Sequence, residues 1–355
     1  MAALDGVHVL DLSLLLPGPL CTQILRDLGA RVTKIEPPAP GDYSALWPPM
    51  VGPVSAAYYA INRGKQVQSL NLKDTNDREQ FLALAREADV VVEGFRPGVI
   101  DKLGIGYERL AAINPRIVVC SISGYGSSGP YTMRGGHDLN YQALAGVLSI
   151  SGERQATPPN PPLQVADTAA GSYAAAMLIL AALLECRRTG RGQHLDVSMS
   201  EQLLPLMTAL YASTAAEGRD PLPDDELLSG GAPCYRIYRT ADDQYLSVGS
   251  LEPKFWQALV VALGLPDLAD EYQMGGPRAE EIAARLAAVI RTRTREEWAR
   301  VFADVDACVE PVLRFSEVQQ HPQWQSRGSF EELPTPDGRT ISVPRMPGSL
   351  AGMRK

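Results

Sequence analysis

The first 123 residues alternate short apolar stretches with helix-like segments, and this alternation restricts the possible fold more than any other feature of the chain. We expect strands at residues 7–12, 31–35, 66–72, 89–95 and 116–123, and helices at 18–29, 74–88 and, interrupted by glycines, 97–113. Short apolar strands that alternate with helices are typical of a parallel, doubly wound sheet. The sequence therefore predicts an α/β fold for this region.

The pattern changes after Tyr141. Apolar helices are expected at 139–148 and 168–185, and the acidic, proline-containing stretch Gly218–Asp225 is typical of an exposed linker. Beyond it we expect both kinds of element: a hairpin at 235–240 and 244–250, a helix opened by Glu252-Pro253, and helices at 280–292 and after the capping box of Thr294 and Glu297. Residues 225–325 therefore predict a second, mixed α+β domain.

The charge balance restricts the partners. The 33 Lys and Arg residues against 41 Asp and Glu residues leave a formal net charge of −8. So acidic a surface argues against nucleic acid or an anionic membrane as the main partner. The longest apolar run, Ala174–Leu184, is also too short to span a bilayer.

The five cysteines indicate a reducing compartment. They are odd in number and never stand in a C-x-x-C spacing, so neither a disulfide framework nor a zinc ribbon is expected. The N-terminal residues lack the basic segment of a secretory signal. We therefore expect a cytoplasmic protein.

A glycine-rich motif at 124–129 matches G-x-G-x-x-G and follows an expected strand. A dinucleotide fingerprint must also open a helix, so that the pyrophosphate lies at the helix N-terminus. Pro130-Tyr131 and a further glycine-rich turn follow instead. The motif therefore predicts a loop that another backbone or a ligand approaches closely, and not a nicotinamide site.

Three titratable residues stand at expected helix starts. His137 precedes an apolar helix, Asp167 precedes the next one as its expected N-cap, and Glu252 precedes Pro253. Capping alone explains the two acids, and a surface turn capped by Asp138 explains the histidine. The functional alternative is an imidazole and carboxylates at the carboxyl edge of an open sheet, where such folds bind ligands.

Basic residues are few, and several follow expected strands or precede helices, where phosphate groups tend to bind. They are Arg63, Lys65, Lys73, Arg96 and Arg134. Solvated surface charge explains any one of them singly. The four histidines show no zinc-ligand spacing, so no metal is expected.

Several collinear motifs resemble the class III CoA-transferases and the related α-methylacyl-CoA racemases, nearly from end to end. They are Asp11-Leu12-Ser13 with Pro17-Gly18-Pro19, Asp27–Ala30, Asn62–Lys65, Leu70-Asn71-Leu72-Lys73, Glu93–Gly98 and Ser121–Gly126. The resemblance implies an acyl-CoA thioester substrate, of which CoA is a part, and no separate cofactor.

The choice of branch depends on fewer residues. Gly136-His137-Asp138-Leu139-Asn140-Tyr141 is similar to the racemase segment whose histidine is a catalytic base, and Glu252 matches an active-site glutamate. Asp167 matches an aspartate of both branches, a proton carrier in racemases and a nucleophile in transferases. One departure is Pro37-Pro38, which stands where some racemases carry an arginine for the nucleotide; Lys34 is a possible substitute.

The resemblance to the racemases implies proton transfer at the α-carbon of a 2-methylacyl-CoA, with His137 and Asp167 as the acid/base pair on opposite faces and Glu252 tuning them. Backbone N–H groups at 136–140 or 167–168 are candidate donors to the enolate oxygen. CoA would be held by Leu70, Asn71, Leu72, Lys73, Arg96, Gly136, Asp138, Leu139, Asn140 and Tyr141, with its phosphates at Lys65, Lys73, Arg96 and Arg134. The alternatives are CoA transfer through Asp167 and simple acyl-CoA binding.

The resemblance also implies an architecture. A large Rossmann-like CoA-binding domain would comprise residues 1–200 and 326–355, followed in sequence by a linker at 201–225 and a small α+β domain at 226–325. Two subunits would thread through each other as an interlocked homodimer.

Overall fold

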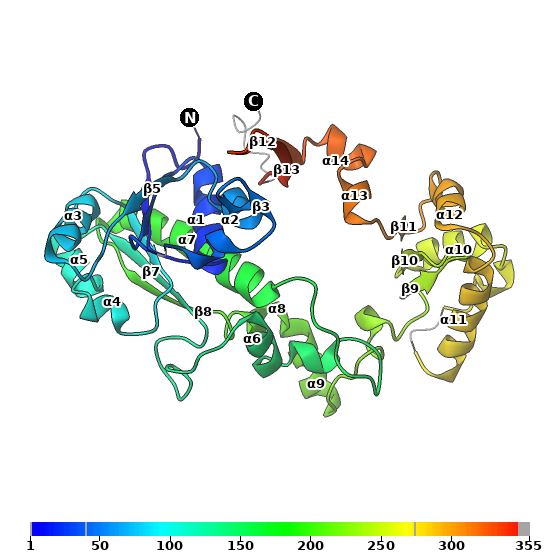
Figure 1. The fold of residues 1–355 in the computed structure, drawn as a ribbon. Coiled ribbons are helices and arrows are strands. Elements are labelled where there is room, and N and C mark those ends of the chain that lie inside the picture. Colours follow the sequence, from blue (N-terminus) through cyan, green and yellow to red (C-terminus); the bar gives the residue numbers. More distant parts are fainter. Residues whose placement is uncertain (1, 40, 273–274, 347–355) are drawn as a thin grey trace. The chain divides into compact units, whose positions relative to one another are not determined.

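The computed structural model describes residues 2–39, 41–272 and 275–346. In it, a parallel sheet of six strands forms the centre of the first part of the chain (Figure 1). The strand order is β5 (Gln66–Ser69), β2 (Arg31–Glu36), β1 (His8–Asp11), β6 (Val90–Glu93), β7 (Val118–Ser123) and β8 (His194–Ser198). Every neighbouring pair is parallel. The predicted α/β fold is confirmed, and β8 is a strand that the sequence pattern did not predict.

Helices cover both faces of this sheet. On one face α1 (Pro17–Asp27) contacts β1 and β2, and α7 (Ala174–Thr189) contacts β7 and β8. On the other lie α3 (Thr75–Ala85), α4 (Val99–Lys102) and α5 (Tyr107–Ile113) (Figure 1). Phe81 and Leu110 of these helices pack against Leu10, Val91 and Val119 of the strands. The inner strands β1, β6 and β7 are therefore largely buried, as parallel strands between helix layers must be, while the edge strand β5 is mostly exposed.

The helix that leads into α7 starts with a π-helical segment, η3 (Ala166–Tyr173). Together they make a 24-residue helix, Ala166–Thr189, that is long and apolar enough to cross a membrane by length and composition. The expectation of too short a run is therefore wrong for the helix as a whole. The helix packs on α1, β7 and β8, and such a core helix passes the same test, so the match is weak evidence for a membrane span.

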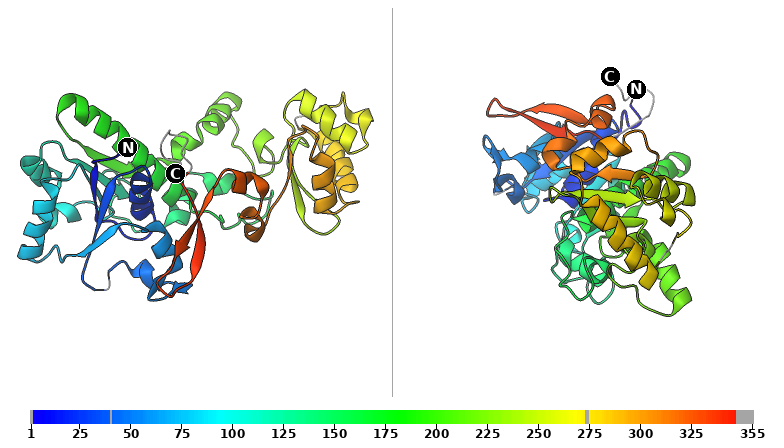
Figure 2. Two further views of the ribbon diagram at one scale, coloured as in Figure 1. Left: turned by 90° about the horizontal axis from the view of Figure 1, so that it is seen from above. Right: turned by 90° about the vertical axis from the view of Figure 1, so that its right-hand side faces the viewer.

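The chain returns to the first unit at its C-terminal end. The hairpin β12 (Phe330–Pro334) and β13 (Thr340–Pro344) lies beside α2 (Ala56–Ile61) and the short strands β3 (Met50–Val51) and β4 (Val54–Ser55) (Figure 2). The Tyr59 hydroxyl donates to the Pro334 carbonyl at 2.8 Å, and Arg63 pairs with Glu331 at 2.7 Å. These contacts join segments more than 250 residues apart in sequence.

A second unit has its own antiparallel sheet, in the order β11 (Val309–Pro311), β10 (Tyr245–Gly249) and β9 (Tyr235–Arg239). It packs with α10 (Pro253–Ala262), α11 (Pro277–Ile290) and α12 (Arg295–Phe302) around buried Trp256 and Trp298. The predicted hairpin and the capping box of Thr294 and Glu297 are confirmed. The core is therefore separate from that of the first unit.

The remaining elements are short. They are η1 (Tyr43–Leu46), α6 (Asp138–Leu144), η2 (Val147–Ile150), α8 (Leu203–Leu206), α9 (Thr208–Glu217), η4 (Leu227–Ser229), η5 (Pro266–Leu268), α13 (Phe315–Val318) and α14 (Pro322–Ser326). The first unit comprises residues up to 145, 161–208 and those from 322 onward, and the second comprises 146–160 with 209–321. The expected large domain differs in that it included 146–160.

Candidate active site

A cavity of about 310 Å³ opens at the carboxyl edge of the first unit's sheet. Its walls are the loops that follow β1, β6 and β7, together with the turn before α6 and the start of η3. The strand order reverses between β1 and β6, so the cavity lies at the topological switch point of the sheet. Open α/β sheets bind their ligands at this place.

His137 lines this cavity as the N-cap residue of α6. Its backbone N–H donates to Asn140 Oδ1 at 3.0 Å, which closes the first turn of the helix. The side chain is exposed, and Gly136 before it packs against an aromatic ring. A Cβ at Gly136 would lie 2.7 Å from the Tyr141 ring, whose hydroxyl donates to the Gly136 carbonyl at 2.5 Å.

The glycine-rich motif after β7 serves the same aromatic ring. A Cβ at Gly124 would lie 2.5 Å from Tyr141, and Tyr125 packs edge-on against Tyr141 with 5.1 Å between ring centroids. No helix begins after the motif before α6 at Asp138. The prediction of a loop for close backbone approach is therefore confirmed, and it places Gly124 and Tyr125 in the cavity wall.

Asp167 lines the same cavity from the first turn of η3. The pKa of Asp167 is raised to about 7, mainly by burial and to a smaller extent by the negative charge of Asp138. A carboxyl with such a pKa exchanges protons readily at neutral pH in either direction. His137 and Asp167 are thus two titratable side chains on the walls of one cavity.

Asp138 holds Asp167 in place. Its Oδ1 accepts hydrogen bonds from the backbone N–H groups of Ala166 (2.7 Å) and Asp167 (3.1 Å), while its Oδ2 accepts from Gln142 at 2.5 Å. The expectation that Asp167 is the N-cap is therefore wrong: Val165 precedes the helix, and Asp138, from a distant turn, satisfies its first N–H groups. The expected cap role of Asp138 in its own helix is wrong too, because it is the first helical residue there.

Several backbone donors expected for an enolate oxygen are already engaged. The N–H of Asp167 donates to Asp138, that of Thr168 to Gln164, and that of Asn140 to the His137 carbonyl. These groups are therefore not available to a ligand in this arrangement. The expectation is therefore wrong for Asn140, Asp167 and Thr168, while the N–H groups of Gly136, Asp138 and Leu139 stay a prediction. Side chains supply the positive charge beside the cavity.

Two arginines border the larger cavity. Arg96 follows β6 and Arg134 lies in the turn before α6; both side chains are exposed. A Cβ at Gly135 would lie 3.4 Å from Arg96 Nη2, so the guanidinium lies over the turn that carries His137. Arg134 stacks on the Tyr131 ring at 4.0 Å from the centroid. The cavity therefore has cations at its rim and aromatic rings in its wall.

A second pocket, of about 160 Å³, lies next to the first at the same edge. Leu70, Leu72 and other apolar side chains line it, together with Asn71 and Lys73. Leu14 and Phe95 line both cavities, so the two share a wall. Pro37, which stands in place of the family arginine, lines the apolar pocket.

Lys65 and Lys34 do not face either cavity. Lys65 Nζ donates to Asp11, the Pro19 carbonyl and two further oxygens at 2.7–3.1 Å and has no exposed side-chain surface. Lys34 is equally buried and donates to the Ser13 carbonyl at 2.7 Å. Their expected roles at the phosphates and the nucleotide are therefore wrong, since a buried, paired ammonium has no surface to offer a ligand.

The other predicted residues fall at different places. Glu252 is the exposed N-cap residue of α10 in the second unit. Leu139 and Asn140 are exposed on α6, where Asn140 supports His137. Within residues 2–39, 41–272 and 275–346 no group of His, Cys, Asp and Glu is arranged to hold a metal ion.

Glu93 is a residue that the sequence analysis left without a role. It is buried at the end of β6, and its Oε2 accepts from the Phe95 N–H at 2.6 Å. Burial raises its pKa to about 7. A charged residue that ends the apolar run Val90-Val91-Val92 was the available signal. Glu93 holds the loop that carries Phe95 and Arg96 to the cavities.

These features define an α/β protein class with a cavity lined by titratable side chains at the switch point of a parallel sheet. The model of CoA-transferase family III matches residues 4–355, and the chain belongs to this family. The resemblance seen in the sequence is thereby confirmed.

Relatives of known name fall in both branches of the superfamily. The chain is 36% identical to α-methylacyl-CoA racemase of Homo sapiens over 352 residues, which cover 97% of this chain and 88% of the relative. It is 35% identical to acetyl-CoA:oxalate CoA-transferase of Acetobacter aceti, covering 91% of this chain and 84% of that protein. The protein is therefore an enzyme of the family III CoA-transferase and racemase superfamily.

Solved structures agree with the fold. A CaiB/BaiF family protein from Brucella suis superposes with a TM-score of 0.85 at 31% identity, covering 99% of this chain and 93% of that one. The match extends over both units of the chain.

Proposed function

We propose that this enzyme inverts the α-carbon of 2-methyl-branched acyl-CoA thioesters by proton transfer through an enolate. The observation that carries the proposal is that His137 and Asp167 line one cavity, with the pKa of Asp167 raised to about 7. Inversion needs a base on one face of the α-carbon and an acid on the other. An imidazole and a carboxyl whose pKa is raised to about 7 suit that task.

The reaction balances without a further reagent. One group of the pair removes the α-proton and leaves an enolate, and the other delivers a proton to the opposite face. The first group is then protonated and the second is not, so the pair is ready for the reverse direction. Arg96 and Arg134 at the rim supply positive charge toward an anionic substrate.

The two cavities suit the two ends of a CoA thioester. An apolar pocket with Lys73 at its edge accommodates a flat base with phosphate groups nearby, and the larger cavity receives the thioester. Lys73, Arg96 and Arg134 replace the larger basic cluster expected from the sequence. The acyl group is proposed to be a branched fatty acyl chain or a sterol side chain.

CoA transfer is the second candidate, favoured by relatives such as human succinyl-CoA:glutarate CoA-transferase, 32% identical over 96% of this chain. In that reaction the Asp167 carboxylate attacks the thioester carbonyl, the C–S bond breaks, and a mixed anhydride forms as CoA thiolate leaves. The thiolate then attacks the aspartyl carbonyl of the anhydride and releases the donor acid as its carboxylate. A nucleophile must be ionised, whereas a pKa of about 7 leaves a large fraction of Asp167 protonated at neutral pH. This argument favours the proton-transfer reaction.

The test is deuterium uptake. A 2-methylacyl-CoA is incubated in heavy water without any acceptor acid, and label at the α-carbon is measured by mass spectrometry. We expect uptake by the wild type and a loss of at least about 100-fold in His137→Ala, the range for a general base. His194→Ala is the matched control, because His194 lies outside the cavity against Ser121 and Tyr107.

Other outcomes select the alternatives. Absence of label, with CoA transfer once a carboxylic acid is added, would establish the transferase. Binding of CoA esters without either reaction would leave only a binding protein.

Three further assignments belong to the same proposal. The enzyme is proposed to act in the cytoplasm as an interlocked homodimer, and Glu252 to tune the acid/base pair. Light scattering measures the oligomer, and Glu252→Gln, assayed for deuterium uptake, measures the contribution of Glu252. Unchanged uptake would remove Glu252 from the mechanism.

A further inference from the structure

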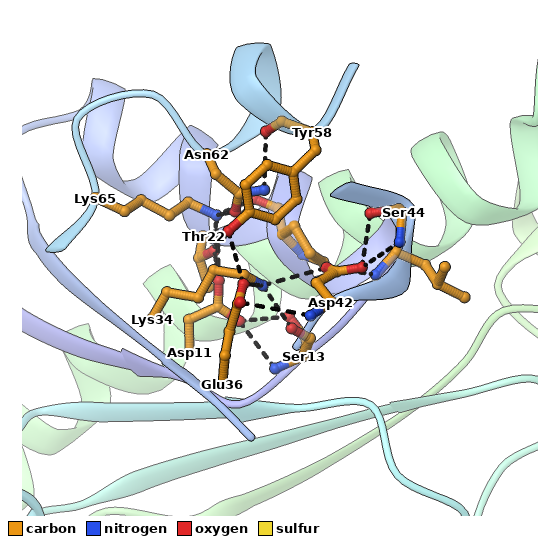
Figure 3. A network of polar contacts seen from close by, with 12 residues as sticks. Asp11, Ser13, Thr22, Lys34, Glu36, Asp42, Ser44, Tyr58, Asn62 and Lys65 are labelled. Carbon is orange, nitrogen blue, oxygen red and sulfur yellow. Dashed lines mark hydrogen bonds and ion pairs between the residues drawn. The ribbon is translucent and has the colours of Figure 1, made fainter. Parts of the chain in front are cut away.

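A buried network of charged side chains lies beneath the cavity wall (Figure 3). Lys65 pairs with Asp11 at 3.1 Å, and Lys34 with Asp42 at 3.5 Å, with no exposed surface on any of the four side chains. Burial alone would raise the pKa of Asp11, but the two ammonium groups lower it to about 2. The carboxylate is therefore charged at neutral pH.

Three buried side chains of this network, those of Asp11, Lys34 and Asp42, form hydrogen bonds with the loop after β1. Asp11 accepts hydrogen bonds from the Ser13 backbone N–H and hydroxyl, and Lys34 Nζ donates to the Ser13 carbonyl at 2.7 Å. Asp42 Oδ2 accepts from the Leu15 N–H at 3.0 Å. The N–H and the carbonyl of Ser13 and the N–H of Leu15 are thus all hydrogen-bonded to buried side chains.

One residue of this loop, Leu15, has an unusual backbone conformation. Leu15 has a φ of +67°, in the left-handed region that non-glycine residues rarely adopt. Such a conformation persists only where the surroundings determine it, and residues of this kind cluster at ligand sites. The N–H of this residue donates to Asp42.

The loop Ser13–Leu15 is also part of the wall of the site. Ser13, Leu14 and Leu15 line the larger cavity with His137 and Asp167, and Leu14 continues into the apolar pocket. A buried ion network is a costly way to stabilise a protein, since apolar residues of the same shape often do as well. Its value therefore lies in the position that it imposes.

We propose that Lys34 and Asp42 are positioning residues that hold the Ser13–Leu15 wall where it meets the acyl thioester, and so make the enzyme prefer thioesters to free CoA. The inference rests on the proposed function only in taking a CoA thioester as the ligand. Neither residue touches the substrate. Both act through the backbone of the wall.

The experiment compares two affinities, those for 2-methylbutanoyl-CoA and for free CoA, by calorimetry. The main variant is the double substitution Lys34→Met with Asp42→Asn, which neutralises both members of this ion pair. Glu36, which lies 3.7 Å from Lys34 and is partly exposed, keeps its hydrogen bond from Tyr58. The control is Tyr58→Phe, which removes the 2.7 Å bond to Glu36 in the same network without a contact to the wall. Unfolding midpoints of both variants are measured alongside.

We expect the preference for the thioester to fall at least about tenfold in the double variant, since small misplacements near a reacting group have such effects. Affinity for free CoA should stay within about threefold of the wild type, and Tyr58→Phe should keep the preference within about twofold. If the double variant does not fold, Asp42→Asn alone is the second test. Its amide oxygen cannot serve both Leu15 and Ser44, so a smaller loss in the same direction is expected.

The inference is overturned if the wild type shows no preference, or if the folded variants keep it. The readout does not depend on racemisation. If the wild type takes up no deuterium, the proposed reaction is rejected. If the double variant then still loses the thioester preference that the wild type shows, the positioning role is upheld.

Discussion

Asp138 and Asp167 have the same side chain, and their surroundings give them different tasks. Asp138 is buried, and its oxygens accept hydrogen bonds from two backbone N–H groups and from Gln142. Asp167 faces the cavity, and burial together with the nearby Asp138 raises its pKa to about 7. Asp167 therefore titrates near neutral pH, whereas Asp138 supports the start of the helix that carries Asp167.

The first residue-scale prediction concerns Asp138→Asn. Its amide oxygen can still accept from the two N–H groups, while its charge is lost, so ionisation of Asp167 becomes easier. The rising limb of kcat/KM against pH, expected near pH 7 in the wild type, should move to lower pH. Burial is the larger cause and remains, so the limb should stay well above the ordinary aspartate range.

The measurement is the pH profile of deuterium uptake, with circular dichroism to show that the helix start is intact. The limb reports the titration of the acid/base pair as a unit. A limb that stays in place or moves to higher pH would contradict the assigned role of Asp138.

The lysines make the same point about charge. Lys65 and Lys73 both stand near expected strand ends, yet Lys65 is enclosed by four oxygen acceptors and Lys73 lies exposed at the apolar pocket. Removing a partner from a buried pair leaves an uncompensated charge and strongly destabilises a protein. Lys65 therefore belongs to the fold, and Lys73 to the candidate binding surface.

At the scale of elements, loops carry the site and strands position it. The turn 135–137 reaches the cavity because its glycines leave room for neighbours from other elements. Gly136 lies against Tyr141 and Tyr125, whereas Gly135 has ordinary van der Waals space beside Arg96. Two adjacent glycines are thus under different packing constraints.

The element-scale prediction is a matched pair. Gly136→Ala places a Cβ 2.7 Å from the Tyr141 ring and should cost about 1–3 kcal/mol in unfolding free energy, because overpacking forces side chains to shift. It should also reduce deuterium uptake, since His137 follows directly. Gly135→Ala should stay within about 0.5 kcal/mol of the wild type.

Urea unfolding measures both variants. Equal stability of the two would show that Tyr141 yields without cost. The packing of the turn would then not be what holds His137.

At the scale of the whole molecule, the two units have separate cores. Phe81 is fully buried among α3, β1, β6 and β7, while Trp256 is buried in the second unit and donates to the Leu268 carbonyl at 2.9 Å. The chain passes between the units more than once, because residues from 322 onward return to the first. Each core therefore closes around its own apolar cluster.

The whole-molecule prediction is that core damage stays local. Phe81→Ala and Trp256→Ala should each destabilise their unit by about 3–5 kcal/mol, the usual cost of removing a buried aromatic side chain. Hydrogen exchange should quicken in β1 and β6 for the first variant and in β9 and β10 for the second. Faster exchange in both sheets from either single variant would show instead that the units unfold together.

The sequence by itself determined the alternation of the strands β1, β2, β5, β6 and β7 with helices, and hence the α/β class, but it did not predict β8. The Thr294–Glu297 capping box and the hairpin of β9 and β10 depend on residues a few positions apart, so local pattern suffices to predict them. The glycine-rich loop after β7 was predicted for the same reason. The placement of His137 at a helix start was also local.

Only the tertiary structure decided which groups are buried, paired or open to a ligand. Lys65 and Asp11 are 54 residues apart in sequence, and Asp138 caps a helix that begins 28 residues later. Burial and electrostatic energy depend on all atoms within several ångströms, whatever their distance along the chain. The pattern of residue types therefore identified the chemistry available, and the fold decided which of those residues face the cavity.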